Sequence, residues 1–349
     1  MSGSGTGVMG GDYGRHAAAQ HAGAQAASAM LGRALAAVPV PGDGRAFRAA
    51  DLGCASGANA LEPMRQVVAA VRGRDGSVPV WVTHTDIPGN DFNALFATVT
   101  GPGGYTREPG VFACAQARSF YERLFPAGEL HLAWSTIAVH WLSRVPRPID
   151  GHVYSSRSTG AARDALRAQS AADWSDFLEH RAAELAPGGQ LVVVGGAATD
   201  DGLSGAEGLF DLALAELEAL VAAGGMAEDR LAAMTVPTWN RTTAEFLEPL
   251  RSGPLAKAFR LEEHEFVVLA DPMWLRFAAD GDLDAYAHEV AASFTAAFGP
   301  SLFAGPAAAG PGAAARFEAG LAARVRTQPE AGAARWRVQL LRATRLDAR

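Results

Sequence analysis

The segment DLGCASGANAL at residues 51–61 constrains the fold of this chain more than any other stretch. It begins with an acidic residue, and its two glycines, Gly53 and Gly57, are separated only by Cys, Ala and Ser. Phe47, Ala49, Ala50 and Leu52 can supply a short buried strand at its start, and apolar residues recur at helical spacing over residues 61–71. The sequence therefore predicts a turn between a buried strand and a helix, in which glycine permits backbone conformations that a side chain would block.

Such a turn is typical of a nucleotide-binding sheet, but this one lacks the fingerprint of dinucleotide enzymes. That fingerprint needs three glycines in G-x-G-x-x-G order and an acidic partner roughly 20 residues later. Here the next acid at the end of a predicted strand is Asp86, which closes residues 80–86. Asp51 can accept hydrogen bonds from a ligand hydroxyl or ammonium group, and Asp86 from ribose hydroxyls. An ordinary strand-turn-helix without a ligand is the alternative interpretation.

Four segments, in this order along the chain, resemble the SABATH methyltransferases, which make methyl esters of small carboxylic acids such as salicylate, benzoate and jasmonate. They are the turn at residues 51–61, DIPGNDFNALF at 86–96, SFYERLFP at 119–126 and HWLSRVP at 140–146. The chain is identified as a member of this family on these segments. The resemblance implies S-adenosylmethionine as methyl donor and S-adenosylhomocysteine as product.

The resemblance also assigns residues to the methyl donor. It implies that Asp51 and Asn59 contact the methionine part, that Asp86 contacts the ribose, and that Ile87, Ser119 and Phe120 contact the adenine, with Gly53 in the turn. It adds Tyr13, from the family pattern S-Y-x-x-N-S-x-x-Q, in which His16 and Ala17 replace Asn and Ser here. For the apolar Ile87 and Phe120, simple core packing is an equally good interpretation.

For the substrate, the resemblance implies a site built from Gln20, Ile137, His140, Trp141 and Trp239. Gln20 and Trp141 each offer a side-chain N–H donor, so we expect them to hold the substrate carboxylate as the catalytic pair; a solvated helix position and core packing are the alternatives. His140 could act as a base or only shape the pocket, and a carboxylate that is already ionised at pH 7 favours the second. Ile137 and Trp239 stand where the family has Tyr.

The order of predicted elements indicates the fold class. A helix over residues 13–38, a central strand at 130–136, a helix at 173–185, a turn at 187–189 and a strand at 191–194 alternate along the chain. We therefore predict an α/β Rossmann-like methyltransferase fold, with a mostly parallel sheet, helices on both faces and an inserted helical cap.

The predicted domain boundaries follow the same pattern. Residues 1–199 form the N-terminal helix and the donor-binding core, 200–251 form the cap over the substrate pocket, and 252–349 complete the sheet with further cap helices. Within the last part we expect a strand at 259–269, a helix at 286–298, a surface loop at 299–315 and a final strand at 336–343, at or near the sheet edge.

Composition excludes several classes of protein. The chain has 349 residues, 49% of them hydrophobic, and a formal charge of −7, so nothing favours nucleic acid as a partner. Cys54 and Cys114 lack the spacing of a metal site, and we predict no metal. No signal peptide and no long apolar run is present, so we expect a soluble, cytoplasmic protein without a membrane partner. The resemblance implies a homodimer.

Two rival functions are compatible with the sequence. One is N-methylation of a heterocycle, which some members of the family carry out. The other is a small-ligand-binding protein that has lost catalysis. The chemical nature of the product separates all three functions.

Overall fold

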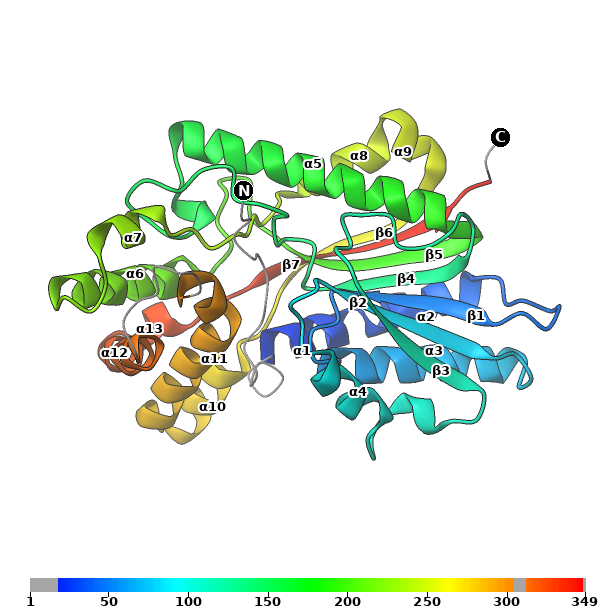
Figure 1. The fold of residues 1–349 in the computed structure, drawn as a ribbon, viewed down its shortest axis with the longest axis horizontal. Helices are drawn as coiled ribbons and strands as arrows, with labels where there is room; N and C mark the ends of the chain where they lie inside the picture. The colour runs from blue at the N-terminus through cyan, green and yellow to red at the C-terminus, as the bar shows by residue number, and fades with distance from the viewer. Residues whose placement is uncertain (1–17, 304–311, 348–349) are drawn as a thin grey trace.

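A mixed seven-stranded sheet forms the centre of the computed structural model, which describes residues 18–303 and 312–347. Its strand order is β3-β2-β1-β4-β5-β7-β6 (Figure 1). Five parallel strands are β1 (Phe47–Leu52), β2 (Val80–Asp86), β3 (Val111–Ala117), β4 (Leu130–Thr136) and β5 (Leu185–Gly196). The strand β7 (Arg337–Arg345) runs antiparallel to both β5 and β6 (Phe259–Val268). The predicted α/β class with a mostly parallel sheet is confirmed.

Central strands of this sheet are apolar on both faces. Leu132, Ala133 and Trp134 in β4 are all buried, as are the consecutive valines 192–194 in β5. Continuous apolar runs of this kind are expected when helices cover both sides of a parallel sheet. The polar groups of a site are therefore found at the strand ends.

Helices cover both faces of the sheet, as predicted (Figure 1). One face carries α2 (Ser28–Ala37), α3 (Leu61–Arg74) and α4 (Phe92–Thr100), whose apolar residues join β1 and β2 in one core. The opposite face carries α5 (Gly160–Glu184), α8 (Thr243–Arg251) and α9 (Gly253–Ala258). The sheet is thus the middle layer of three.

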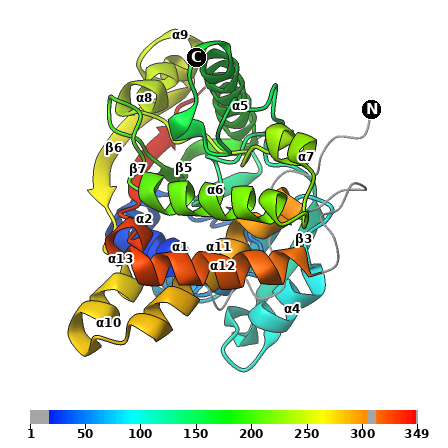
Figure 2. The ribbon, with the colours of Figure 1, turned by 90° about the vertical axis from the view of Figure 1, so that its left-hand side faces the viewer.

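A helical lobe stands beside the sheet and has its own apolar core (Figures 1 and 2). It contains α6 (Glu207–Ala222), α7 (Glu228–Ala233), α10 (Pro272–Asp280), α11 (Leu283–Phe303), α12 (Ala313–Thr327) and α13 (Pro329–Gly332). Residues 200–251, predicted as the cap, contribute only α6 and α7 to this lobe. The helix α8 lies on the sheet instead, because Phe246 stacks on Trp174 of α5 with ring centroids 4.8 Å apart.

Several element boundaries differ from those predicted. The described part of the N-terminal helix consists of α1 (Ala18–Ala26) and α2, which are separated at Ala27. The long helix α5 begins at residue 160, thirteen positions before the predicted start. β5 begins at Leu185, because the predicted turn forms an irregularity inside the strand, between pairs Leu130–Leu185 and Leu132–Gln190.

The C-terminal part contains more helix than predicted. α11 continues through Pro300 to Phe303, since Phe298 and Leu302 pack in the lobe core, and α12 begins at Ala313. The prediction of a loop over residues 299–315 is therefore wrong at both ends. The last strand, β7, lies one place in from the sheet edge, which β6 forms. Over the described residues, no helix has the length and apolar character needed to span a membrane.

Candidate functional site

A pocket opens at the carboxyl ends of β1, β2 and β4, and we call it the strand-end pocket. Seven residues predicted to bind the methyl donor line it together: Asp51, Gly53, Asn59, Asp86, Ile87, Ser119 and Phe120. The carboxyl ends of parallel strands meet at one edge of a sheet, which explains why segments so distant in sequence converge here. Tyr13 lies outside the described residues.

The turn after β1 depends on its two glycines. Gly53 has φ of +86°, and a Cβ there would lie 2.5 Å from the Cβ of Ala138. Gly57 has φ of +78°, and its Cβ would lie 2.6 Å from Leu95 Cδ1. Both positions therefore require glycine on grounds of conformation and of space, because Ala138 and Leu95 already occupy the volume that a Cβ would need.

Asp86 fastens the tip of this turn. Its Oδ2 accepts a hydrogen bond of 2.7 Å from the Ala55 N–H, and its Oδ1 accepts one of 2.8 Å from the Ile87 N–H. The amide of Asn90 donates to the Ala55 carbonyl over 2.9 Å, which helps to hold Ala55 at a φ of +44°. Burial raises the pKa of Asp86 to about 6. Asn90 lies in the segment at residues 86–96 that resembles the family, but we predicted no role for it.

The carboxylate of Asp51 is oriented by two buried residues, His84 and Tyr105, for which we predicted no role. Its Oδ2 lies 2.7 Å from His84 Nδ1, and His84 Nε2 lies 2.5 Å from the Tyr105 hydroxyl. A carboxylate accepts hydrogen bonds, so Nδ1 donates to Asp51, and the Tyr105 hydroxyl lies within hydrogen-bond distance of Nε2. The other oxygen of Asp51 has no hydrogen bond to any residue of the described ranges and is available to a ligand in the pocket.

The same cluster has the composition of a metal site, since Asp51, Cys54 and His84 place ligand atoms within 4.8 Å of one another. One observation argues against this use, since the facing atoms of Asp51 and His84 already share a hydrogen bond. Burial raises the pKa of the Cys54 thiol well above its usual range.

The segment that carries Ser119 and Phe120 is fixed by a buried ion pair on α5. Arg181 Nε donates to Glu184 Oε2 over 2.7 Å, and both side chains are fully buried. Arg181 also donates to the Phe120 carbonyl over 2.8 Å, while Glu184 accepts from the Leu124 N–H over 2.6 Å. The pair therefore serves to hold the backbone of this pocket wall.

A second cavity adjoins the first between the sheet and the helical lobe, and we call it the lobe chamber. It shares Ile137 and Trp141 with the strand-end pocket, and His140 also lines it. Its wall is mostly apolar, with Leu209, Leu269, Met273, Val290, Phe294, Ala297, Phe298, Ala334, Trp336 and Val338. Three of the five residues predicted to bind substrate therefore lie at one junction.

Trp141 separates the two cavities. Its carbonyl accepts a hydrogen bond of 2.6 Å from the Tyr121 hydroxyl, a contact that the sequence analysis missed, and its ring packs 5.9 Å from that of Phe298. The indole N–H has no hydrogen-bond partner among the described side chains and backbone groups. Gln20, the predicted second donor, belongs to α1, but its side chain lies outside what the structure describes.

His140 is half-buried, with its Nδ1 atom inaccessible to solvent, and it is uncharged. Burial, and then the nearby positive charge of Arg241, lower the pKa of His140 to about 3. Within the described ranges its Nδ1 has no hydrogen-bond partner. A group with this pKa is a weak base at neutral pH, which argues for a role in shaping the chamber.

The two positions where the family has Tyr differ in their surroundings. Ile137 has φ of +51°, unusual for a β-branched residue, and its N–H donates to the Val194 carbonyl over 2.7 Å. Trp239 lines neither the strand-end pocket nor the lobe chamber; its indole donates to Glu245 over 3.1 Å. The next residue, Asn240, lines the chamber instead.

Comparisons with known proteins identify the family of the chain. The profile of the family described as SAM dependent carboxyl methyltransferase matches residues 1–304. A probable 7-methylxanthine methyltransferase from Theobroma cacao is 34% identical over 212 residues, which cover 56% of this chain and 58% of that protein. Salicylate carboxymethyltransferase from Clarkia breweri is 30% identical over 246 residues, covering 67% of this chain and 66% of that protein. The chain thus spans less than two thirds of either relative.

A solved structure extends the comparison to the fold. Loganic acid methyltransferase with SAH superposes with a TM-score of 0.80 at 22% identity, covering 97% of this chain and 99% of that chain. This likeness shows a common fold, which includes the sheet, its covering helices and the helical lobe. Together with the profile match over most of the sequence, it leads to one conclusion: the chain belongs to the family of SAM-dependent carboxyl methyltransferases.

Proposed function

We propose that this protein transfers the methyl group of S-adenosylmethionine to the carboxylate of a small apolar or aromatic acid, giving a methyl ester and S-adenosylhomocysteine. The observation that carries the proposal is the junction of the two cavities. The strand-end pocket, with its two carboxylates, meets the apolar lobe chamber at Ile137 and Trp141.

The strand-end pocket fits the methyl donor. Asp51 and Asp86 offer carboxylate oxygens for an ammonium group and for ribose hydroxyls, and Asn59 and Ser119 add neutral polar groups. The Thr136 hydroxyl is buried in the same wall and has no partner in the part of the chain described. The donor would supply an electrophilic methyl group on a positively charged sulfur.

The protein's own task in this reaction is positioning. A carboxylate is ionised at pH 7, so no residue has to remove a proton from it. The indole N–H of Trp141, together with the amide of Gln20, would orient the acid through neutral donors, which leave its negative charge available for attack. A cationic side chain would bind the acid more tightly but would also stabilise the charge that must be lost.

The lobe chamber would contribute by excluding water. Charges on donor and acid cancel as the new bond forms, so an apolar wall disfavours the separated charges more than the transition state. Phe294 and Phe298 supply much of that wall. Holding the two reactants in line would then account for most of the rate enhancement.

N-methylation of a heterocycle is the second candidate function. The neutral imidazole of His140 lines the chamber and favours it, because a neutral ring nitrogen can accept a hydrogen bond from a heterocycle N–H. Relatives named as methylxanthine methyltransferases also support it. We retain the carboxyl reaction as the first proposal because the matching family is that of the SAM dependent carboxyl methyltransferases.

Incubation with labelled donor and a panel of aromatic, fatty and isoprenoid acids tests the proposal. We expect an extractable labelled product that mild base destroys, as an ester must be. Label that survives base would indicate an N-methyl product, and donor binding without any product would indicate a ligand-binding relative. We also propose a homodimer by analogy with the family; light scattering that gives the monomer mass at micromolar concentration would contradict it.

A further inference from the structure

Asn240 presents its amide to the lobe chamber, on the segment between α7 and α8. Gly196, at the end of β5, makes room for it. A Cβ at position 196 would lie 2.2 Å from Asn240 Oδ1 and 3.0 Å from His140 Cγ. The absence of a side chain there lets the Asn240 carbonyl oxygen occupy the chamber wall next to the imidazole.

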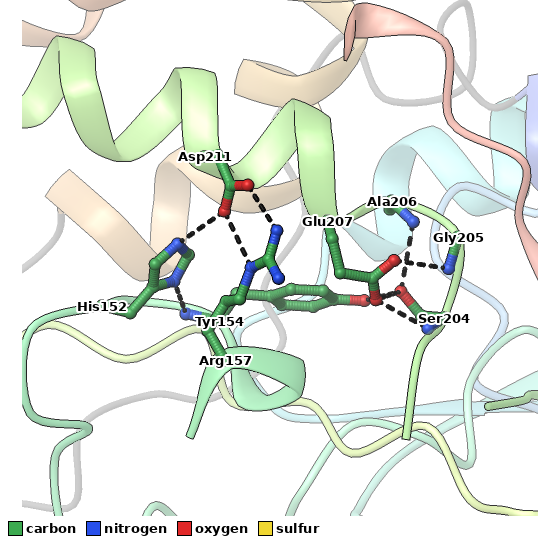
Figure 3. A network of polar contacts seen from close by, with 8 residues as sticks. All are labelled: His152, Tyr154, Arg157, Ser204, Gly205, Ala206, Glu207 and Asp211. Atoms are coloured by element: carbon green, nitrogen blue, oxygen red, sulfur yellow. Dashed lines mark hydrogen bonds and ion pairs between the residues drawn. The ribbon is translucent and has the colours of Figure 1, made fainter. Parts of the chain in front are cut away.

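The amide is the first member of a hydrogen-bond chain that ends on a carboxylate. Asn240 Nδ2 donates to the Tyr154 oxygen over 2.9 Å, and the Tyr154 hydroxyl lies 2.7 Å from Ser204 Oγ. Ser204 Oγ lies 2.8 Å from Glu207 Oε1 at the start of α6 (Figure 3). Glu207 also accepts from the backbone N–H groups of Ser204 and Gly205.

The carboxylate sets the direction of every hydrogen bond in this chain. Burial acts to raise the pKa of Glu207, but the hydrogen bonds from Ser204 outweigh it and lower the pKa, so the carboxylate is ionised and only accepts. The single hydroxyl proton of Ser204 therefore goes to Glu207, and that of Tyr154 goes to Ser204. The Tyr154 oxygen can then only accept, which requires the N–H side of Asn240 to face it.

The hydrogen-bond chain from Asn240 to Glu207 is also rigid. Tyr154 is buried and stacks on Phe210 of α6, with ring centroids 3.7 Å apart and planes 5° from parallel. A second anchor joins the same two segments, since Asp211 of α6 accepts from Arg157 over 2.9 Å and pairs with His152 (Figure 3). The amide of Asn240 cannot turn over without loss of this network.

The carbonyl oxygen of Asn240 is thus locked toward the chamber, and it has no hydrogen-bond partner among the described residues. We infer that Asn240 determines substrate specificity: it accepts a hydrogen bond from a hydroxyl or N–H group on the body of the substrate, apart from the carboxylate. This inference rests on the proposed function. An acid without such a donor leaves the carbonyl oxygen unpaired in an apolar wall, and sites of this kind discriminate strongly against it.

Calorimetry on the full chain saturated with S-adenosylhomocysteine tests the inference. The probes are benzoate, its three monohydroxy isomers and the matching methoxybenzoates, with indole-3-carboxylate and its N-methyl derivative as the N–H pair. At least one acid with a free hydroxyl or N–H group should bind ten-fold or more tightly than the methylated form of the same acid. A hydroxybenzoate that does so should also bind ten-fold or more tightly than benzoate. Asn240→Leu should abolish that preference, whereas Asn93→Leu, the same change on the exposed surface of α4, should keep it.

Tyr154→Phe provides a second variant, which keeps the stacked ring and releases the amide. It should reduce the preference even if Asn240→Leu fails to fold. A preference that survives in Asn240→Leu or is untouched in Tyr154→Phe would overturn the inference, as would equal binding of all probes by the wild type. If the Asn240-dependent preference is found but no probe is methylated, the proposed function fails for these acids, while the role of Asn240 in selecting the bound ligand stands.

Discussion

His84 of β2 donates a hydrogen bond of 2.7 Å from Nδ1 to Oδ2 of Asp51 on the adjacent strand β1, and both side chains are buried. The two residues are direct neighbours in the parallel register of these strands. This hydrogen bond fixes the orientation of the Asp51 carboxylate at the end of β1. A second hydrogen bond, between His84 and Tyr105, fixes the orientation of the imidazole.

We therefore expect His84→Leu to weaken binding of S-adenosylhomocysteine by about 1–3 kcal/mol, because one buried oxygen of Asp51 loses its partner. Tyr105→Phe keeps the ring and removes only the hydroxyl that hydrogen-bonds to Nε2, so its effect should be smaller and in the same direction. Calorimetry measures both. Unchanged affinity in a folded His84→Leu protein would show that the pair has only a structural role.

Asp86 gives donor binding a pH dependence. Burial raises its pKa to about 6 from an ordinary value near 3.8, so the carboxylate is protonated as the pH falls from 7 to 5. An ionised carboxylate accepts the stronger hydrogen bonds from ribose hydroxyls, so affinity for S-adenosylhomocysteine should fall over this range. Asp86→Asn should flatten the profile. Parallel pH profiles for the two proteins would contradict the assignment.

Removal of the same side chain measures its contribution directly. Asp86→Ala should weaken donor binding by about 1.5–3 kcal/mol through lost charge-assisted hydrogen bonds, with the protein still folded. The Ala55 and Ile87 N–H groups lose an acceptor as well, so circular dichroism should accompany the calorimetry. Wild-type affinity would refute the ribose contact.

Trp141→Phe and Gln20→Leu test the proposed carboxylate clamp. Each removes a neutral donor at similar size and should lower kcat/KM by roughly ten- to several-hundred-fold, or about 1.4–3 kcal/mol. Affinity for S-adenosylhomocysteine is the internal control and should not change. Wild-type efficiency in both variants would mean that the acid is held elsewhere, with His140 the next candidate.

Ile137 stores backbone strain at the junction of the two cavities. A left-handed conformation costs roughly 1–3 kcal/mol for a residue that does not favour it, and branching at Cβ adds to the crowding. Ile137→Leu should therefore raise the free energy of unfolding by about 0.5–1 kcal/mol, part of that strain. Ile87→Leu, without a positive φ, is the matched control. Equal changes in both variants on chemical denaturation would exclude strain as the cause.

The sequence by itself determined the features that depend on local chemistry. Gly53 and Gly57 take positive φ, a local preference of glycine that the sequence shows by itself, whereas the close approach of Ala138 and Leu95 to them belongs to the folded structure. Apolar runs located the central strands, and strand ends located Asp51 and Asp86. Because parallel strands end at one edge, these two carboxylates could be expected in one pocket.

Only the tertiary structure decided which side chains work together across long separations. The contact between His84 and Asp51 depends on strand register, which no local pattern records. Trp239 and Asn240 lie on a segment without helical or strand periodicity, so the sequence could not tell which of them faces the lobe chamber. Tertiary hydrogen bonds determine the orientation of both side chains. The indole of Trp239 donates to Glu245 and the amide of Asn240 donates to Tyr154, and both bonds exist only once the chain has folded.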